Sequence, residues 1–78
     1  MPRVVTDGRF DVCVFADDHN PPHCHVYWDG DGKMAMVRLR TLNQDCGDKL
    51  PKQAKKLLAI AAEELRREWN RLNPNKRI

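Results

Sequence analysis

All three histidines of this chain lie in one short segment, residues 17–28, which reads DDHNPPHCHVYW. Histidine titrates near neutral pH and is the commonest metal ligand in proteins. If residues 23–28 form a strand, alternate side chains share a face, so His23, His25 and Tyr27 point the same way. The types and spacing of these residues predict a functional site on that face, with the imidazoles of His23 and His25 side by side and open to solvent.

Two chemistries fit this pattern. Imidazoles two residues apart on a strand can bind one divalent transition metal together. His19 would then join His23 and His25 as the third ligand of that metal. The same pair can instead act as general base and general acid on a phosphodiester, with Tyr27 beside it as a further candidate catalytic group. The same residues can also form a polar outer sheet face without chemistry, or a surface for a protein partner.

The elements that must position this segment are strands. Residues 9–15 alternate with period two, and Asp7-Gly8 before them favours a hairpin with residues 3–6. After the double proline, residues 23–28 and 33–40 form the next hairpin across the turn DGDG. In the second of these strands Val37 and Leu39 are expected in the core. Residues 41–47 are polar and are predicted to be irregular.

The spacing of the apolar residues changes after residue 48. Apolar side chains recur at helical spacing from Leu50 to Leu72, which predicts one long amphipathic helix that places Trp69 in the core. Asp48 is the expected cap, Pro51 suits the first turn, and Asn73-Pro74 ends the helix. Residues 75–78 are expected to fray. The predicted fold is a single α+β domain over residues 1–78, with an antiparallel sheet of three to four strands and a C-terminal helix on one face.

Charge is divided unevenly along the chain. Residues 1–48 carry a net charge of −3 and residues 49–78 a net charge of +6. Such asymmetry suggests an anionic partner, RNA or DNA, although a solvated helix face explains it as well. The candidate nucleic-acid-binding residues are the basic ones on the second hairpin and the helix: Arg38, Arg40, Lys52, Lys55, Lys56, Arg66 and Arg67.

Composition narrows the classes of protein to which the chain can belong. No apolar run approaches the roughly 20 residues of a membrane span, and the N-terminus lacks a secretory signal, so a cytoplasmic location without membrane contact is expected. The cysteine count is odd, which favours reduced thiols, and Cys24 is expected in the core. The chain has no Gly-rich phosphate loop, nucleophile elbow or dinucleotide fingerprint, which argues against ordinary cofactor enzymes.

The central motif resembles that of a known family. The run DHNPPHCHV at residues 18–26, a Met-Pro start, a Gly-containing turn and a helix opened near Leu50-Pro51 are similar to the small bacterial domain of unknown function 4160 family. Cys24 stands where that family usually has an aliphatic residue. The resemblance implies a compact α+β domain and a gene arrangement similar to toxin–antitoxin pairs.

These observations lead to three hypotheses. The first is a small cytoplasmic component of a toxin–antitoxin-like or mobile-element module. It would bind or act on nucleic acid through the basic helix and the His-x-His strand. The second is a non-catalytic protein-interaction module, with a cognate small protein encoded nearby or a second copy of the chain as partner. The third is a small metal-binding domain.

Overall fold

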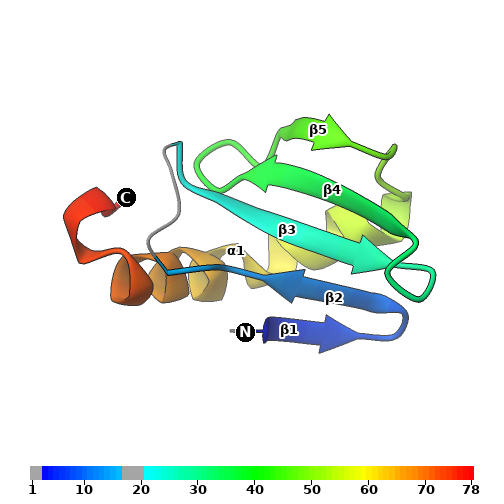
Figure 1. The fold of residues 1–78 in the computed structure, drawn as a ribbon, viewed down its shortest axis with the longest axis horizontal. Helices are drawn as coiled ribbons and strands as arrows, with labels where there is room; N and C mark the ends of the chain where they lie inside the picture. Colours follow the sequence, from blue (N-terminus) through cyan, green and yellow to red (C-terminus); the bar gives the residue numbers. More distant parts are fainter. Residues whose placement is uncertain (1–2, 17–20) are drawn as a thin grey trace.

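The computed structural model describes residues 3–16 and 21–78 of the chain. Five strands form one antiparallel sheet in the order β1-β2-β3-β4-β5, and a single long helix, α1, crosses behind it (Figure 1). The strands and helices have these bounds: β1 Arg3–Asp7, β2 Phe10–Cys13, β3 His23–Trp28, β4 Lys33–Arg38, β5 Gln44–Gly47, α1 Lys52–Leu72 and the 3₁₀ helix η1 Pro74–Lys76. The α+β class predicted from the sequence is confirmed, with five strands instead of three to four.

The core lies between α1 and one face of the sheet. Alternate residues of the central strands, such as Val12, Val26 and Val37, are fully buried there, as period-two patterning predicts. The helix contributes a stripe of its own, in which Leu65 and Trp69 are fully buried. The opposite face of the sheet is not covered by any element in residues 3–16 or 21–78 (Figure 1).

The strand that sequence patterning missed is β5. Its four residues are all exposed, so they show no apolar alternation, and β5 is defined by backbone pairing with β4. The register shifts between Met36 and Val37, where β5 accommodates an extra residue as a bulge. A strand that buries nothing has no hydrophobic signal in its sequence, which is why residues 41–47 were predicted to be irregular.

The start of α1 also differs from the prediction. Asp48 does not cap the helix, because its Oδ2 accepts a hydrogen bond from the Met34 amide at 3.0 Å, and its own amide donates to the Met34 carbonyl at 2.8 Å. These bonds extend the pairing beside β4. The helix therefore begins at Lys52, with Pro51 in the N-cap position.

The C-terminal residues fold back on the helix instead of fraying. The indole Nε1 of Trp69 donates to the Lys76 carbonyl at 2.7 Å, and the Ile78 amide donates to Asn70 Oδ1 at 2.7 Å. Asn73 is buried, and its side-chain Nδ2 donates to the Phe15 carbonyl at 2.9 Å. These bonds hold η1 and the end of β2 against the last turn of α1.

Candidate functional site

Strand β3 carries the histidines on the sheet face opposite α1. Cys24 and Val26 of this strand are fully buried on the helix side, as predicted, so alternation directs His23, His25 and Tyr27 to the other side of the sheet. His23, at the start of the strand, also reaches the Trp69 ring near the end of α1. Register places His25 between Cys13 of β2 and Met36 of β4. The predicted sharing of one face by these three ring side chains is therefore confirmed.

The two imidazoles lie side by side but differ in exposure. Their ring centroids are 5.0 Å apart and the rings are inclined at 69°. His23 is only 2% exposed and lies 5.9 Å from the Trp69 ring, whereas His25 is half-buried. The expectation that both rings open to solvent is wrong for His23, because the strand begins where the end of α1 packs against the sheet.

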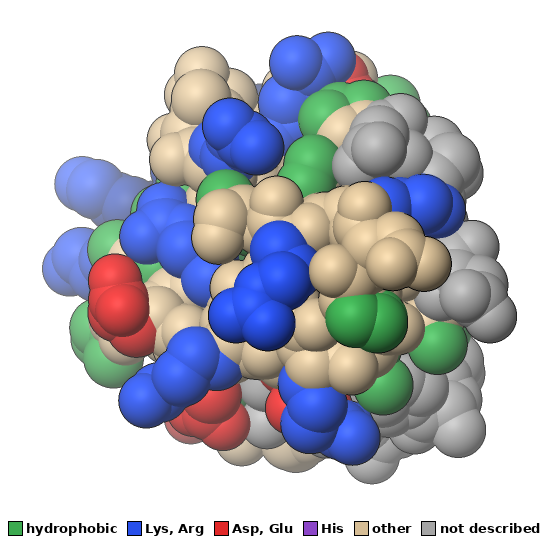
Figure 2. All heavy atoms as spheres, turned by 90° about the vertical axis from the view of Figure 1, so that its left-hand side faces the viewer, with side chains coloured by type: hydrophobic (Ala, Val, Ile, Leu, Met, Phe, Trp, Pro, Cys, Tyr) green, Lys and Arg blue, Asp and Glu red, His purple; other side chains and the backbone are tan. Residues whose placement is uncertain are grey.

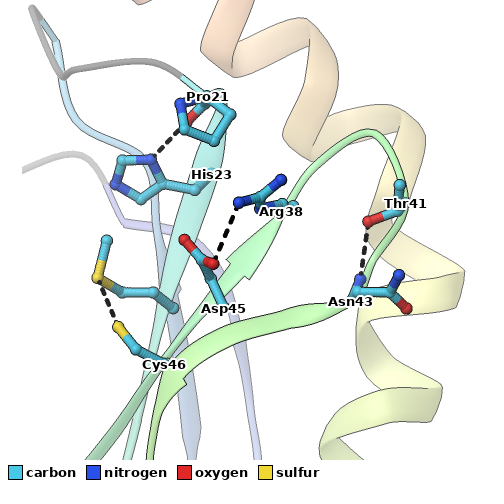
Figure 3. A network of polar contacts seen from close by, with 8 residues as sticks. Pro21, His23, Arg38, Thr41, Asn43, Asp45 and Cys46 are labelled. Atoms are coloured by element: carbon cyan, nitrogen blue, oxygen red, sulfur yellow. Dashed lines mark hydrogen bonds and ion pairs between the residues drawn. The ribbon is translucent and has the colours of Figure 1, made fainter.

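The His23 ring is held by the double-proline segment. Its Nδ1 lies 2.8 Å from the Pro21 carbonyl oxygen (Figure 3). A carbonyl oxygen only accepts, so Nδ1 carries the proton in this hydrogen bond. Pro21 and Pro22 restrict the backbone that presents this carbonyl, which gives the prolines a local role in orienting the imidazole.

A row of aromatic rings accompanies His25. Phe15 meets it edge-on at 4.8 Å between centroids, and Tyr27 is nearly parallel to it, at 6.2 Å and 13°. All three side chains are half-buried. The pKa of Tyr27 is raised above its ordinary value, first by burial and then by the nearby Cys13 and Asp31. Tyr27 is therefore a neutral phenol near pH 7.

The metal prediction involves residues that the structure only partly describes. His19 lies outside the described residues. Within the ranges 3–16 and 21–78, no group of three or more histidine, cysteine or acidic side chains is arranged to hold a metal ion. His23 and His25 supply two neighbouring imidazoles, one fewer than the three protein ligands usual for a catalytic zinc.

An ion pair lies beside the histidines. Arg38, opposite His23 in the register, has its Nη2 atom 3.3 Å from Asp45 Oδ1 (Figure 3). Asp45 is the extra residue of the β5 bulge, and Cys46 next to it places its sulfur 3.4 Å from the Met36 sulfur. Sequence reasoning missed Asp45, because only the bulge brings it to Arg38.

Cationic side chains gather at the end of the molecule where α1 terminates. Figure 2 shows this end, with Lys and Arg side chains spread over it and Asp and Glu side chains beside some of them. The segments 38–43 and 66–78 meet there, since Arg66 Nε donates to the Leu39 carbonyl at 2.8 Å and Arg66 Nη2 to the Arg40 carbonyl at 3.3 Å. We call the segments 38–43 and 66–78 together the basic end, and their cations are Arg38, Arg40, Arg66, Arg67, Arg71, Lys76 and Arg77.

The cations of the basic end play different roles. Arg66 joins helix to sheet, and Arg38 and Arg71 pair with Asp45 and Glu68. Three others, Arg40, Arg67 and Arg77, are exposed, and no carboxylate among the described residues lies within ion-pair distance of them. Of these three, Arg77 was not predicted, because residues 75–78 were expected to fray.

The predicted nucleic-acid-binding residues therefore do not form one surface. Arg38, Arg40, Arg66 and Arg67 come together at the basic end. Lys52, Lys55 and Lys56 are exposed in the first turns of α1, toward its other end (Figure 1). From Lys56 to Arg67 the helix rises by about 17 Å. Lys55 lines a separate hollow of about 290 Å³, together with Leu42, Leu50 and Leu58.

The buried thiol of Cys24 makes the stability of the fold depend on pH. Burial raises the pKa of Cys24 from its ordinary 9.0 to about 12. The folded state disfavours the thiolate, whereas the unfolded state does not. The stability that the buried neutral thiol contributes is therefore fully present below about pH 9 and is lost as the pH rises toward about 12. We expect the urea midpoint to fall between about pH 8 and about pH 10.5, and to fall less in Cys24→Ala. Equal pH dependence in both proteins would contradict this assignment.

The fold and the site define a small α+β domain with a ring-lined sheet face beside a basic end. The family model described as domain of unknown function DUF4160 matches residues 10–70, and the chain belongs to this family. No significant match was found among curated proteins or among solved structures. No helix in the described part of the chain is long and apolar enough to cross a membrane.

Proposed function

We propose that this protein binds nucleic acid through its basic end, as a small cytoplasmic component of a toxin–antitoxin-like or mobile-element module. The observation that carries the proposal is the set of exposed arginines Arg40, Arg67 and Arg77, which come from two separate segments and pair with no carboxylate of the described residues. The module itself is proposed from the gene arrangement that the family resemblance implies.

The side chains of these three arginines are suited to binding the phosphate groups of an external partner. A guanidinium presents a planar fork of donors that matches phosphate oxygens, and it stays charged at any physiological pH. Arg66 fixes the β4–β5 loop to α1, so Arg40 and Arg67 extend from backbone that is already in place. Binding then needs little further ordering of the protein, which favours affinity.

Salt dependence provides the first test. Each phosphate neutralised by a cation releases counterions, so three arginines give a slope of log K against log salt of about −2 to −3. We expect this slope for a labelled oligonucleotide titrated with the protein and followed by fluorescence anisotropy. An affinity that stays constant from low to high salt would exclude the proposed phosphate contacts.

Charge reversal at the basic end, compared with charge reversal at the start of α1, provides the second test. The double variant Arg40→Glu/Arg67→Glu is expected to weaken binding by about 100-fold, and to flatten the salt slope by about 2. The matched control is Lys52→Glu/Lys56→Glu, which changes net charge equally at the other end of the helix. Equal losses in the two variants would mean that net charge, not the basic end, attracts the nucleic acid.

The same samples decide whether binding is accompanied by cleavage. His25 and Tyr27 are the half-exposed members of the predicted catalytic set, while His23 is buried. Gel analysis of the oligonucleotide after incubation separates the two cases. An intact strand indicates a binding protein, and fragments that disappear with His25→Ala indicate general acid–base catalysis at this face.

A further inference from the structure

The open face of the sheet has the composition of a binding surface. The half-buried side chains of Phe15, His25, Tyr27, Met34 and Met36 lie on it. No helix or strand in the described part of the chain packs over this face of the sheet (Figure 1). Sheets normally bury an apolar face against another layer. In this protein α1 covers the other face, and this one has no second layer among residues 3–16 and 21–78.

We infer that this face binds the bases of a single-stranded nucleic acid. The inference rests on the proposed function and names its substrate class. Phe15, just after β2, and His25 and Tyr27 of β3 form a row, with neighbouring ring centroids 4.8 Å and 6.2 Å apart. Rings on an antiparallel sheet stack unpaired bases in single-strand binding proteins, and each stacked base contributes about 1–3 kcal/mol.

The position of the rings relative to the cations supports this occupant. Arg38, which pairs with Asp45, lies on the same face, two register pairs beyond Met36 and His25, and Arg40 follows it at the basic end. A single strand supplies flat apolar bases and phosphates together, so it matches the rings and the arginines at once. A duplex keeps its base faces stacked inside and presents only base edges and backbone.

The test compares three probes of about eight nucleotides, a length within the site sizes of single-strand binders. They are a single-stranded RNA, its blunt duplex and an abasic sugar–phosphate strand of equal charge. At one salt concentration we expect the RNA strand to bind about 10-fold more tightly than the abasic strand. Equal affinity for these two probes would overturn the inference while leaving the proposed phosphate contacts intact. Failure to bind any probe would overturn the proposed function itself.

Variants of Tyr27 assign the effect to the rings. Tyr27→Leu keeps an apolar side chain but removes the π face, and is expected to weaken RNA binding by about 10-fold without changing abasic-strand binding. Tyr27→Phe keeps the ring and should bind like the parent protein. Ile60→Ala, on the outer face of α1 at a side chain 84% exposed, is the control away from the sheet. A urea midpoint measured for each variant verifies folding.

One outcome would assign the face to a protein partner instead. If Tyr27→Leu leaves RNA binding unchanged but shifts the protein from dimer to monomer in analytical ultracentrifugation, the rings form an interface between copies of the chain. That result would overturn the inference. Loss of RNA affinity with an unchanged oligomeric state would support it.

Discussion

Replacing Trp69 with alanine is expected to lower the free energy of unfolding by about 3–5 kcal/mol. Trp69 is fully buried, lies 5.9 Å from the His23 ring and donates its indole hydrogen bond to the Lys76 carbonyl. The substitution removes the largest fully buried side chain and leaves a cavity where α1, β3 and η1 meet. A domain of this size has only about 5 kcal/mol of stability, so Trp69→Ala should retain no more than about 2 kcal/mol.

Urea denaturation followed by far-ultraviolet circular dichroism measures this loss. Trp69→Phe keeps a ring in the core but removes the indole donor, and should cost about 1–2 kcal/mol and remain folded. Ile60→Ala on the same helix should change stability by less than about 0.5 kcal/mol, because Ile60 is largely exposed. A Trp69→Ala protein with the parent's urea midpoint would show that this junction is not part of the stabilising core.

Gly47→Ala is expected to cost about 2–4 kcal/mol. Gly47 has φ of +102°, and a Cβ atom there would lie 2.7 Å from the Ala35 Cα and inside contact distance of the Met34 carbonyl oxygen. Both neighbours are backbone atoms of β4, so no side-chain rotation can relieve the clash. The strands must separate locally, which weakens the pairing that brings Asp45 to Arg38.

Gly8 offers a matched control for this substitution. It also has positive φ, +58°, but a Cβ there would meet no described atom within 4 Å. Gly8→Ala therefore costs only the left-handed backbone penalty, about 1 kcal/mol. Hydrogen exchange should show loss of protection at the Asp48 amide, which bonds the Met34 carbonyl, in Gly47→Ala alone. Equal costs for the two glycines would refute the proposed clash.

The burial of His23 changes what the histidine pair can do. A general acid or base must reach the proton that it transfers, and a ring that is 2% exposed between Pro21 and Trp69 does not meet a large substrate. His25 is the more exposed imidazole of the two. His23 instead links the double-proline segment to the end of α1, so the PPHCH motif serves the fold as well as the site.

Local patterning in the sequence determined most of the secondary structure. Period-two alternation predicted β2, β3 and β4, and helical spacing predicted α1 with Trp69 in its core stripe. The alternation within β3 also placed His23, His25 and Tyr27 on one face. These features follow from the sequence because each depends on residues that are near neighbours along the chain, where backbone geometry sets the direction of the side chains.

Only the tertiary structure decided which residues meet across the chain. The burial of His23 depends on where the end of α1 packs, and the Arg38–Asp45 pair depends on a bulge in an exposed strand that has no hydrophobic signal. The separation of the basic end from Lys52, Lys55 and Lys56 depends on the length of α1 and on the Arg66 contacts to the β4–β5 loop. Long-range packing and backbone pairing set these distances, and neither leaves a periodic pattern in the sequence.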